Sequence, residues 1–190
     1  NGKRCQALGV AKNHAIVMPD ADIDNAVNQL TGAAFGSSGE RCMALSVAVA
    51  VGDEAGDALV AKMSEAMKGL TVGAYDNASN DFGPVITAAH KEKVQGYITS
   101  AENDGAKVVV DGRDPKVDGY DNGFFVGATL IDNVTANMDS YDAEIFGPVL
   151  QVVRVKTMEE AMKLINDHEY GNGTCIFTRD GEAARYFSDN

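Results

Sequence analysis

The chain has 190 residues, of which 45% are hydrophobic and 23% are charged, and its formal net charge is −12. This composition is typical of a globular protein that is long enough to bury a hydrophobic core without disulfides or a structural metal. The acidic balance argues against nucleic acid and anionic membrane surfaces as partners, because few cations are available to neutralise phosphates. No apolar run approaches the roughly 20 residues that a transmembrane helix needs.

The predicted elements in chain order alternate between helices and strands. Asp20 is a candidate N-cap for a helix that runs to about Phe35, because apolar residues recur there at the helical period. Small polar residues at 36–40 predict a turn that ends this helix, and the apolar run 46–51 predicts a buried strand. A second helix face follows, made by Leu59, Val60, Met63 and Met67.

The second half of the chain continues this alternation. Thr87 is a candidate N-cap of a third helix, residues 107–110 predict a short strand, and the stretch 111–122, rich in Gly, Asp and Pro, predicts a surface loop. Further strands are predicted at 124–131, 149–155 and 174–177, and further helices after Thr157, which has capping-box spacing, and after Asp180. The alternation favours one α/β domain over residues 1–190, with an open, mainly parallel, twisted sheet and helices on both faces.

The N-terminus and the positions of the cysteines and histidines give further expectations. The N-terminus has no signal-peptide pattern and no initiator Met, so we expect the chain to be a fragment of a longer protein. Cysteines at 5, 42 and 175 and histidines at 14, 90 and 168 are spaced too widely for a disulfide framework or a metal site. We therefore expect no bound metal, a reducing compartment of the cytosolic type, and histidines on the surface or in loops.

Cys42 is the candidate nucleophile. It lies between a predicted helix and a predicted buried strand, in a stretch of small residues that leaves room for a substrate. Cysteine reacts as the thiolate, which the adjacent Arg41 would favour and the negative C-terminal end of the preceding helix would oppose. The alternative is a buried small hydrophobic residue, which is the commonest fate of a free cysteine. The residue and its neighbours alone do not decide between these alternatives.

A second candidate motif is Glu144-Ile145-Phe146-Gly147-Pro148-Val149. Glu144 could accept hydrogen bonds from sugar hydroxyls, and Phe146 could pack on a flat ring. The alternative is an ordinary turn before a strand, and the motif alone favours that alternative.

Taken together, the two motifs resemble the aldehyde dehydrogenase superfamily. Gly39-Glu40-Arg41-Cys42 precedes Glu144-Ile145-Phe146-Gly147-Pro148 in the order that is typical of this superfamily. Four other stretches resemble it in the expected order, at 16–22, 82–86, 125–130 (with Ala128 in place of the usual Pro) and 170–173. Residues 11–14 and 39–46 are most similar to its CoA-acylating branch, the methylmalonate-semialdehyde dehydrogenases.

The resemblance implies a role for each candidate residue. The Cys42 thiolate would attack an aldehyde carbon, a hydride would pass to NAD, and a thioester would remain on the sulfur. The backbone N–H of Cys42 would help to hold the oxyanion. Glu144 would bind the nicotinamide ribose and Phe146 would pack beside the nicotinamide ring. Arg41 would hold a substrate carboxylate, with an ordinary surface arginine as the alternative.

Leu8 separates this chain from the hydrolytic members of the superfamily. Aligned on Lys12, Leu8 occupies the position where those members carry the glutamate that activates water for deacylation. Leucine cannot act as a general base, so either another carboxylate replaces it or the acyl group passes to the thiol of coenzyme A. The second option implies oxidation of methylmalonate or malonate semialdehyde to propionyl-CoA or acetyl-CoA with loss of CO₂, with NAD as cofactor and coenzyme A as co-substrate.

The chain lacks a Gly-rich dinucleotide fingerprint. The resemblance therefore implies that the NAD-binding domain and a C-terminal oligomerisation segment lie outside this chain, and that the isolated chain binds NAD poorly. The full-length enzyme would be a homo-oligomer, either a dimer or a tetramer, in the cytoplasm or, in a eukaryote, in the mitochondrial matrix. The alternatives are a hydrolytic dehydrogenase of the succinate-semialdehyde type and an inactive structural module.

Overall fold

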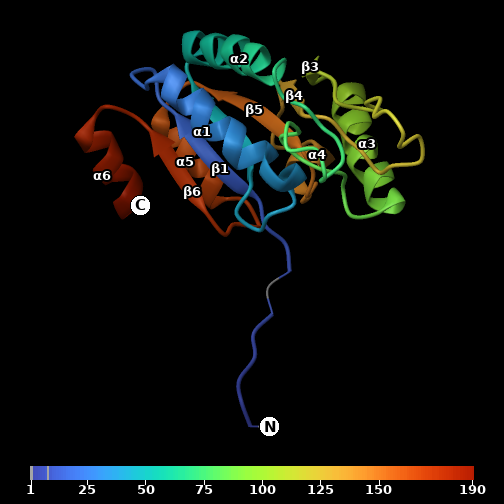
Figure 1. Cartoon of the computed structure of the whole chain (residues 1–190). Coiled ribbons are helices and arrows are strands. Elements are labelled where there is room, and N and C mark those ends of the chain that lie inside the picture. The colour runs from blue at the N-terminus through green and yellow to red at the C-terminus, as the bar shows by residue number, and fades with distance from the viewer. Residues whose placement is uncertain (1, 8) are drawn as a thin grey trace.

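Six strands form one sheet at the centre of the computed structural model, which describes residues 2–7 and 9–190 (Figure 1). The strands are β1 (Asn13–Val17), β2 (Leu45–Val51), β3 (Lys107–Val110), β4 (Thr129–Asp132), β5 (Val149–Val155) and β6 (Thr174–Phe177). Their order across the sheet is β3-β4-β5-β2-β1-β6, and each neighbouring pair is parallel except β3 with β4. The predicted, mainly parallel sheet is therefore confirmed.

Helices cover both faces of this sheet (Figure 1). The helices α1 (Ile23–Phe35) and α2 (Asp53–Met67) pack on one face, and α3 (Ala88–Asn103), α4 (Asp139–Asp142) and α5 (Met158–Asn166) pack on the other. Strand β2 alternates between the two cores: Val47, Val49 and Val51 face α3 and α5, whereas Ala48 and Ala50 face α1 and α2. The last helix, α6 (Gly181–Asp189), buries none of its residues.

The helix starts follow the predicted caps, with one exception. The side chains of Thr87, Thr157 and Asp180 accept hydrogen bonds from the first backbone N–H groups of α3, α5 and α6. The prediction for α1 is wrong by two residues, because Asp22 caps this helix. Asp20 instead accepts hydrogen bonds from Thr178 and Arg179, beyond the end of β6.

The strand predictions hold except at one segment. Residues 124–128, predicted as strand, lie outside the sheet, and β4 begins only at Thr129. The Phe124 carbonyl accepts from Val85 N–H, and Gly127 packs on Gly112 so closely that a Cβ on Gly112 would lie 2.0 Å from Gly127 O. The segment is therefore bound to two loops instead of to a neighbouring strand. Strand β1, which lies between β2 and β6, was not predicted.

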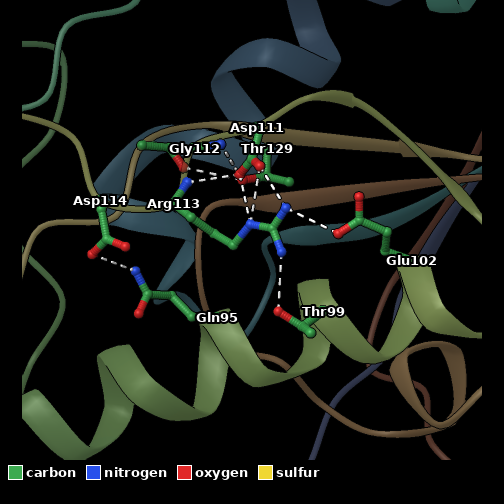
Figure 2. A network of polar contacts seen from close by, with 9 residues as sticks. Gln95, Thr99, Glu102, Asp111, Gly112, Arg113, Asp114 and Thr129 are labelled. Carbon is green, nitrogen blue, oxygen red and sulfur yellow. Dashed lines mark hydrogen bonds and ion pairs between the residues drawn. The ribbon is translucent and has the colours of Figure 1, made fainter.

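The predicted loop at 111–122 is confirmed, and a network of polar contacts ties it to α3 (Figure 2). The Arg113 guanidinium donates to Asp111 (2.6 Å), Glu102 (3.0 Å) and Thr99 (3.0 Å). Gln95 donates to Asp114 at 3.0 Å. These contacts raise the pKa of the Arg113 guanidinium and lower the pKa of the Asp111 carboxyl. The loop is therefore fixed as a structural part of the domain.

No helix within residues 2–7 and 9–190 is both long and apolar enough to cross a membrane. Over the same residues, no group of three or more His, Cys, Asp or Glu side chains is placed to hold a metal ion.

Candidate active site

A cleft lies where the loops that precede four strands meet. Strands β1, β2, β5 and β6 are mutually parallel neighbours, so their amino ends lie at one edge of the sheet. The cleft has a volume of about 690 Å³. It is lined by Ala7, Gly9, Val10, Ala11, Cys42, Glu144, Phe146, Glu169, Tyr170, Gly171 and Asn172. Three of the four predicted site residues, Cys42, Glu144 and Phe146, thus share one cleft.

Cys42 lies at the second position of a turn that is closed by a hydrogen bond from Ala44 N–H to Arg41 O, at 3.1 Å. Its side chain is exposed, which is contrary to the alternative of a buried hydrophobic residue. Within residues 2–7 and 9–190, the Cys42 backbone N–H makes no hydrogen bond. The turn therefore offers a thiol and an unpaired N–H donor on the same residue.

Two asparagines that sequence reasoning missed hold the carbonyl group of Cys42. Asn13 Nδ2 donates to Cys42 O at 2.9 Å and to Ala44 O at 2.8 Å, and Asn172 Nδ2 donates to Cys42 O at 2.8 Å. Both asparagines lie at the amino edge, Asn13 as the first residue of β1 and Asn172 just before β6. Both lie in stretches that resemble the superfamily, at 11–14 and 170–173, but the resemblance gave neither a role, because only the strand order brings them to Cys42.

Close backbone packing fixes the loop before Cys42. Gly39 has φ +68°, and a Cβ at this position would lie 2.1 Å from Gly147 O. Ser38 Oγ donates to Gly83 O at 2.8 Å, and Glu40 Oε1 accepts from Ile86 N–H at 3.2 Å. The nucleophile loop therefore rests directly on the loop that carries the second motif.

Glu144 is half-buried and faces the cleft. Its Oε1 accepts a hydrogen bond from Ala11 N–H at 2.9 Å, and no hydrogen bond from the described residues reaches Oε2. One carboxylate oxygen is thus held by the chain and the other remains available to a ligand. A plain turn would not require this cross-sheet contact.

The buried Lys12 shapes the segment that leads to Glu144. Lys12 is 1% exposed, and its Nζ donates to Ser140 O (2.9 Å), Ala143 O (2.7 Å) and Gln151 Oε1 (3.2 Å). Burial lowers the pKa of Lys12 to about 7, although the carboxylates of Asp142 and Glu144 oppose this shift. Lys12 was used only to align the sequence, and its burial was not predicted.

Phe146 has a backbone φ of +57°, which non-glycine residues seldom adopt. Its carbonyl oxygen lies 2.6 Å from His90 Nε2, and the same nitrogen lies 3.4 Å from Glu40 Oε1. His90 therefore bridges the two motif loops from α3, so the expectation of an ordinary surface or loop histidine is wrong here.

The same expectation is wrong for His14, which is 1% exposed within β1. Its Nδ1 lies 3.0 Å from Lys12 O and its Nε2 lies 3.0 Å from Tyr141 Oη, so neutral His14 can donate to the carbonyl and accept from the phenol. Burial and the neighbouring His168 lower the pKa of His14 to about 4. The ring is thus a neutral core group at pH 7.

Arg41 is exposed and lines a narrow recess beside Cys42, not the wide cleft. Its Nε lies 3.2 Å from Ser37 Oγ, and its guanidinium covers the Gly36 backbone. Cys42, Glu144 and Phe146 also line this recess, so the structure brings all four predicted site residues together there. Cys5 is exposed, and burial raises the pKa of the half-buried Cys175 in β6. The argument from Leu8 falls outside the described residues.

Comparisons with known proteins agree with these motifs. The sequence profile of the aldehyde dehydrogenase family matches residues 1–190. A malonate-semialdehyde dehydrogenase of Pseudomonas aeruginosa is 64% identical over 188 residues, which are 99% of this chain and 38% of that protein. A mitochondrial, acylating methylmalonate-semialdehyde/malonate-semialdehyde dehydrogenase of Rattus norvegicus is 51% identical over 188 residues, which are 99% of this chain and 35% of that protein.

Solved structures show the same relationship. The methylmalonate-semialdehyde dehydrogenase of Oceanimonas doudoroffii matches with a TM-score of 0.97 and 77% identity, over 100% of this chain and 39% of that one. A Sinorhizobium meliloti protein, named provisionally as a methylmalonate-semialdehyde dehydrogenase and solved with NAD, matches with a TM-score of 0.97 and 53% identity, over the same shares of the two chains. The chain thus spans little more than a third of these relatives. Because the family profile matches it from end to end, the chain belongs to the aldehyde dehydrogenase family.

Proposed function

We propose that this chain carries the nucleophile of an NAD-dependent, CoA-acylating oxidation of methylmalonate or malonate semialdehyde. The observation that carries the proposal is the exposed Cys42 turn in a cleft that Glu144 and Phe146 also line. The substrate class comes from the names of the relatives, which are malonate- and methylmalonate-semialdehyde dehydrogenases.

The Cys42 turn suits attack on a carbonyl group. The thiolate forms a bond to the aldehyde carbon, and the carbonyl oxygen then takes up the negative charge. The unpaired Cys42 N–H belongs to the same residue as the sulfur and can donate to that oxygen. Loss of a hydride from the carbon then leaves a thioester on Cys42.

The cleft fits the nicotinamide riboside end of NAD. The free oxygen of Glu144 can accept from ribose hydroxyls, and the Phe146 ring can pack on the nicotinamide. Among the described residues that line the cleft there is no Lys or Arg, whereas two are the acids Glu144 and Glu169, so the cleft does not suit the pyrophosphate. When bound, NAD supplies the acceptor for the hydride. Its phosphates must be held by residues beyond this cleft.

Arg41 is the proposed partner of the substrate carboxylate. Its Nε contacts Ser37, whereas no side chain of the described residues accepts from its two terminal nitrogens. These nitrogens can donate two parallel hydrogen bonds to a carboxylate beside Cys42. An Arg41→Lys substitution tests this role, because an ammonium keeps the charge and loses the bidentate geometry. We expect KM for the semialdehyde to rise about tenfold, by the loss of one charged hydrogen bond.

The fate of the thioester distinguishes this proposal from hydrolysis. Transfer to coenzyme A is supported by Leu8 at the position of the usual base and by the word "acylating" in the name of the rat relative. One observation favours hydrolysis instead: Glu169 lines the cleft and supplies a carboxylate that could activate water.

The deciding experiment measures NADH formation by the complete protein from malonate semialdehyde, with and without coenzyme A, and identifies the product by mass spectrometry. We expect acetyl-CoA and CO₂ as the products, and turnover that depends on coenzyme A. Release of free acid without coenzyme A, abolished by Glu169→Gln, would establish the hydrolytic alternative. Cys42→Ala should remove both activities, and an active Cys42→Ala variant would refute the assignment of the nucleophile.

A further inference from the structure

We propose that Asn13 and Asn172 are positioning residues that hold the nucleophile through the carbonyl oxygen of Cys42. The inference rests on the proposed function of Cys42. It goes beyond that function by assigning a positioning task to two side chains that hydrogen-bond to the backbone of Cys42.

The two amides bind one oxygen from two strands that lie next to each other. Asn13 Nδ2 donates to Cys42 O at 2.9 Å and Asn172 Nδ2 donates to it at 2.8 Å. A carbonyl oxygen has two lone pairs, so both of its acceptor sites are filled. Rotation of the Cys42–Met43 peptide plane would break both contacts.

Asn13 is a buried junction between the loops. It is 2% exposed; its Nδ2 also donates to Ala44 O at 2.8 Å, and its Oδ1 accepts from Gly173 N–H at 2.7 Å. Every hydrogen-bonding group of this amide is therefore used, and a flipped amide would set a donor against the Gly173 N–H. The pairing of β1 with β2 also shifts register between Asn13 and His14, so the strand itself is irregular at this junction.

Asn172 differs from Asn13 in its exposure and in its backbone conformation. It is exposed, and its φ of +131° is disfavoured for any residue with a side chain. Glycine would suit this backbone better, and glycines flank it at 171 and 173. Among the described residues, the Asn172 side chain donates only to Cys42 O. Asparagine at position 172 therefore strains the loop backbone, and its side chain stabilises the Cys42 turn.

Fixing the carbonyl also fixes the reacting groups. The turn is closed at Arg41 O by Ala44 N–H, and the two amides hold it through Cys42 O. The Met43 side chain adds a contact, because its Cε would lie 2.5 Å from a Cβ on Gly173. The sulfur and the free N–H of Cys42 are thereby kept in one orientation before a substrate arrives, which lowers the cost of reaching the transition state.

The test uses Asn172, because its loss need not disturb folding. In the complete protein, Asn172→Gly removes the amide and relieves the backbone, and Asn172→Asp keeps the size but replaces the donor by an anion. Asn122→Asp, in the exposed loop between β3 and β4, introduces the same charge away from the cleft and is the control. Peptide mass spectrometry measures the iodoacetamide rate at Cys42 separately from Cys5 and Cys175. Stopped flow measures the NADH burst.

We expect Asn172→Gly to melt at or above the wild-type temperature while the burst rate and the alkylation rate at pH 7 fall by about threefold to tenfold, as for one lost hydrogen bond. The alkylation rate falls because Cys42 O then keeps only the Asn13 donor, so more of its partial negative charge acts on the thiolate. Asn172→Asp should fall further, Asn122→Asp should match wild type, and KM for NAD should stay within about twofold. Equal alkylation in Asn172→Asp and Asn122→Asp would overturn the proposal. If the wild type gives no burst with any semialdehyde, the proposed function fails, and the alkylation rates still decide the role of Asn172.

Discussion

Lys12 should make the stability of this chain depend on pH in the mildly alkaline range. Its ammonium is 1% exposed, and burial lowers its pKa from 10.5 to about 7. An unfolded chain returns the group to its ordinary pKa. Between these two values the unfolded state binds one proton more than the folded state, so the free energy of unfolding rises with pH. Below pH 7 both states are protonated, and the contribution no longer changes.

The size of the effect follows from the proton difference. One proton corresponds to about 1.4 kcal/mol for each pH unit, and Lys12 is already half deprotonated at pH 7 in the folded state. The gain between pH 7 and pH 9 is therefore about 2 kcal/mol. Lys12→Met keeps a long flexible side chain and removes the titration.

Urea unfolding of the 190-residue chain at pH 6, 7, 8 and 9 measures this difference. The stability of the wild type minus that of Lys12→Met should grow by about 2 kcal/mol from pH 7 to pH 9 and should change little below pH 6. Lys116→Met, which removes an exposed lysine, should run parallel to the wild type. Parallel profiles for wild type and Lys12→Met would refute the depressed pKa and with it the desolvated ammonium.

Three further predictions concern the core, the nucleophile loop and the cofactor. Burial lowers the pKa of His14 to about 4 in the folded state, against an ordinary value of about 6.5 in the unfolded chain. The free energy of unfolding should therefore fall by about 3 kcal/mol as pH falls from 6.5 to 4, and urea unfolding of His14→Gln should show a smaller loss over this range. Gly39→Ala should lower the NADH burst rate of the complete protein at least about tenfold, because its Cβ would lie 2.1 Å from Gly147 O. Gly96→Ala, which has open space around it, is the control and should be as active as wild type. A fully active Gly39→Ala would contradict the close packing of the two loops. The isolated chain should show no saturable NAD binding by calorimetry, because the part of the cleft lining that the structure describes holds no Lys or Arg. Clear aldehyde-dependent NADH production by the isolated chain would disprove this.

The sequence predicted the start of a helix well where a single N-cap side chain determines it. Thr87, Thr157 and Asp180 cap their helices as expected, because an N-cap needs only its own side chain and the next turn. The prediction that Asp20 caps α1 was wrong because two aspartates, Asp20 and Asp22, lie close together before this helix. Asp20 is engaged in tertiary contacts with Thr178 and Arg179, and Asp22 caps the helix instead.

The site could be predicted only in part, for a similar reason. Cys42, Glu144 and Phe146 were found through motifs, whereas their common cleft depends on the order β5-β2-β1 in the sheet. Burial was the least visible property. Lys12 and His14 are polar residues, yet both side chains enter the core, because a carbonyl of α4 and the phenol of Tyr141 bind them there.

Because the cleft opens at the amino edge of the sheet, the full length of the strands separates the carboxyl edge from the chemistry. Cys42 precedes β2 and the exposed Glu54 follows it, in the first turn of α2. At about 3.3 Å per residue, the seven residues of β2 span about 23 Å. A fluorophore attached at position 54 would therefore stay clear of the substrate and remain within energy-transfer distance of an acceptor carried by the thioester. Such a pair would report the formation and the cleavage of the Cys42 thioester in real time. The acyl label would be the only group added to the cleft.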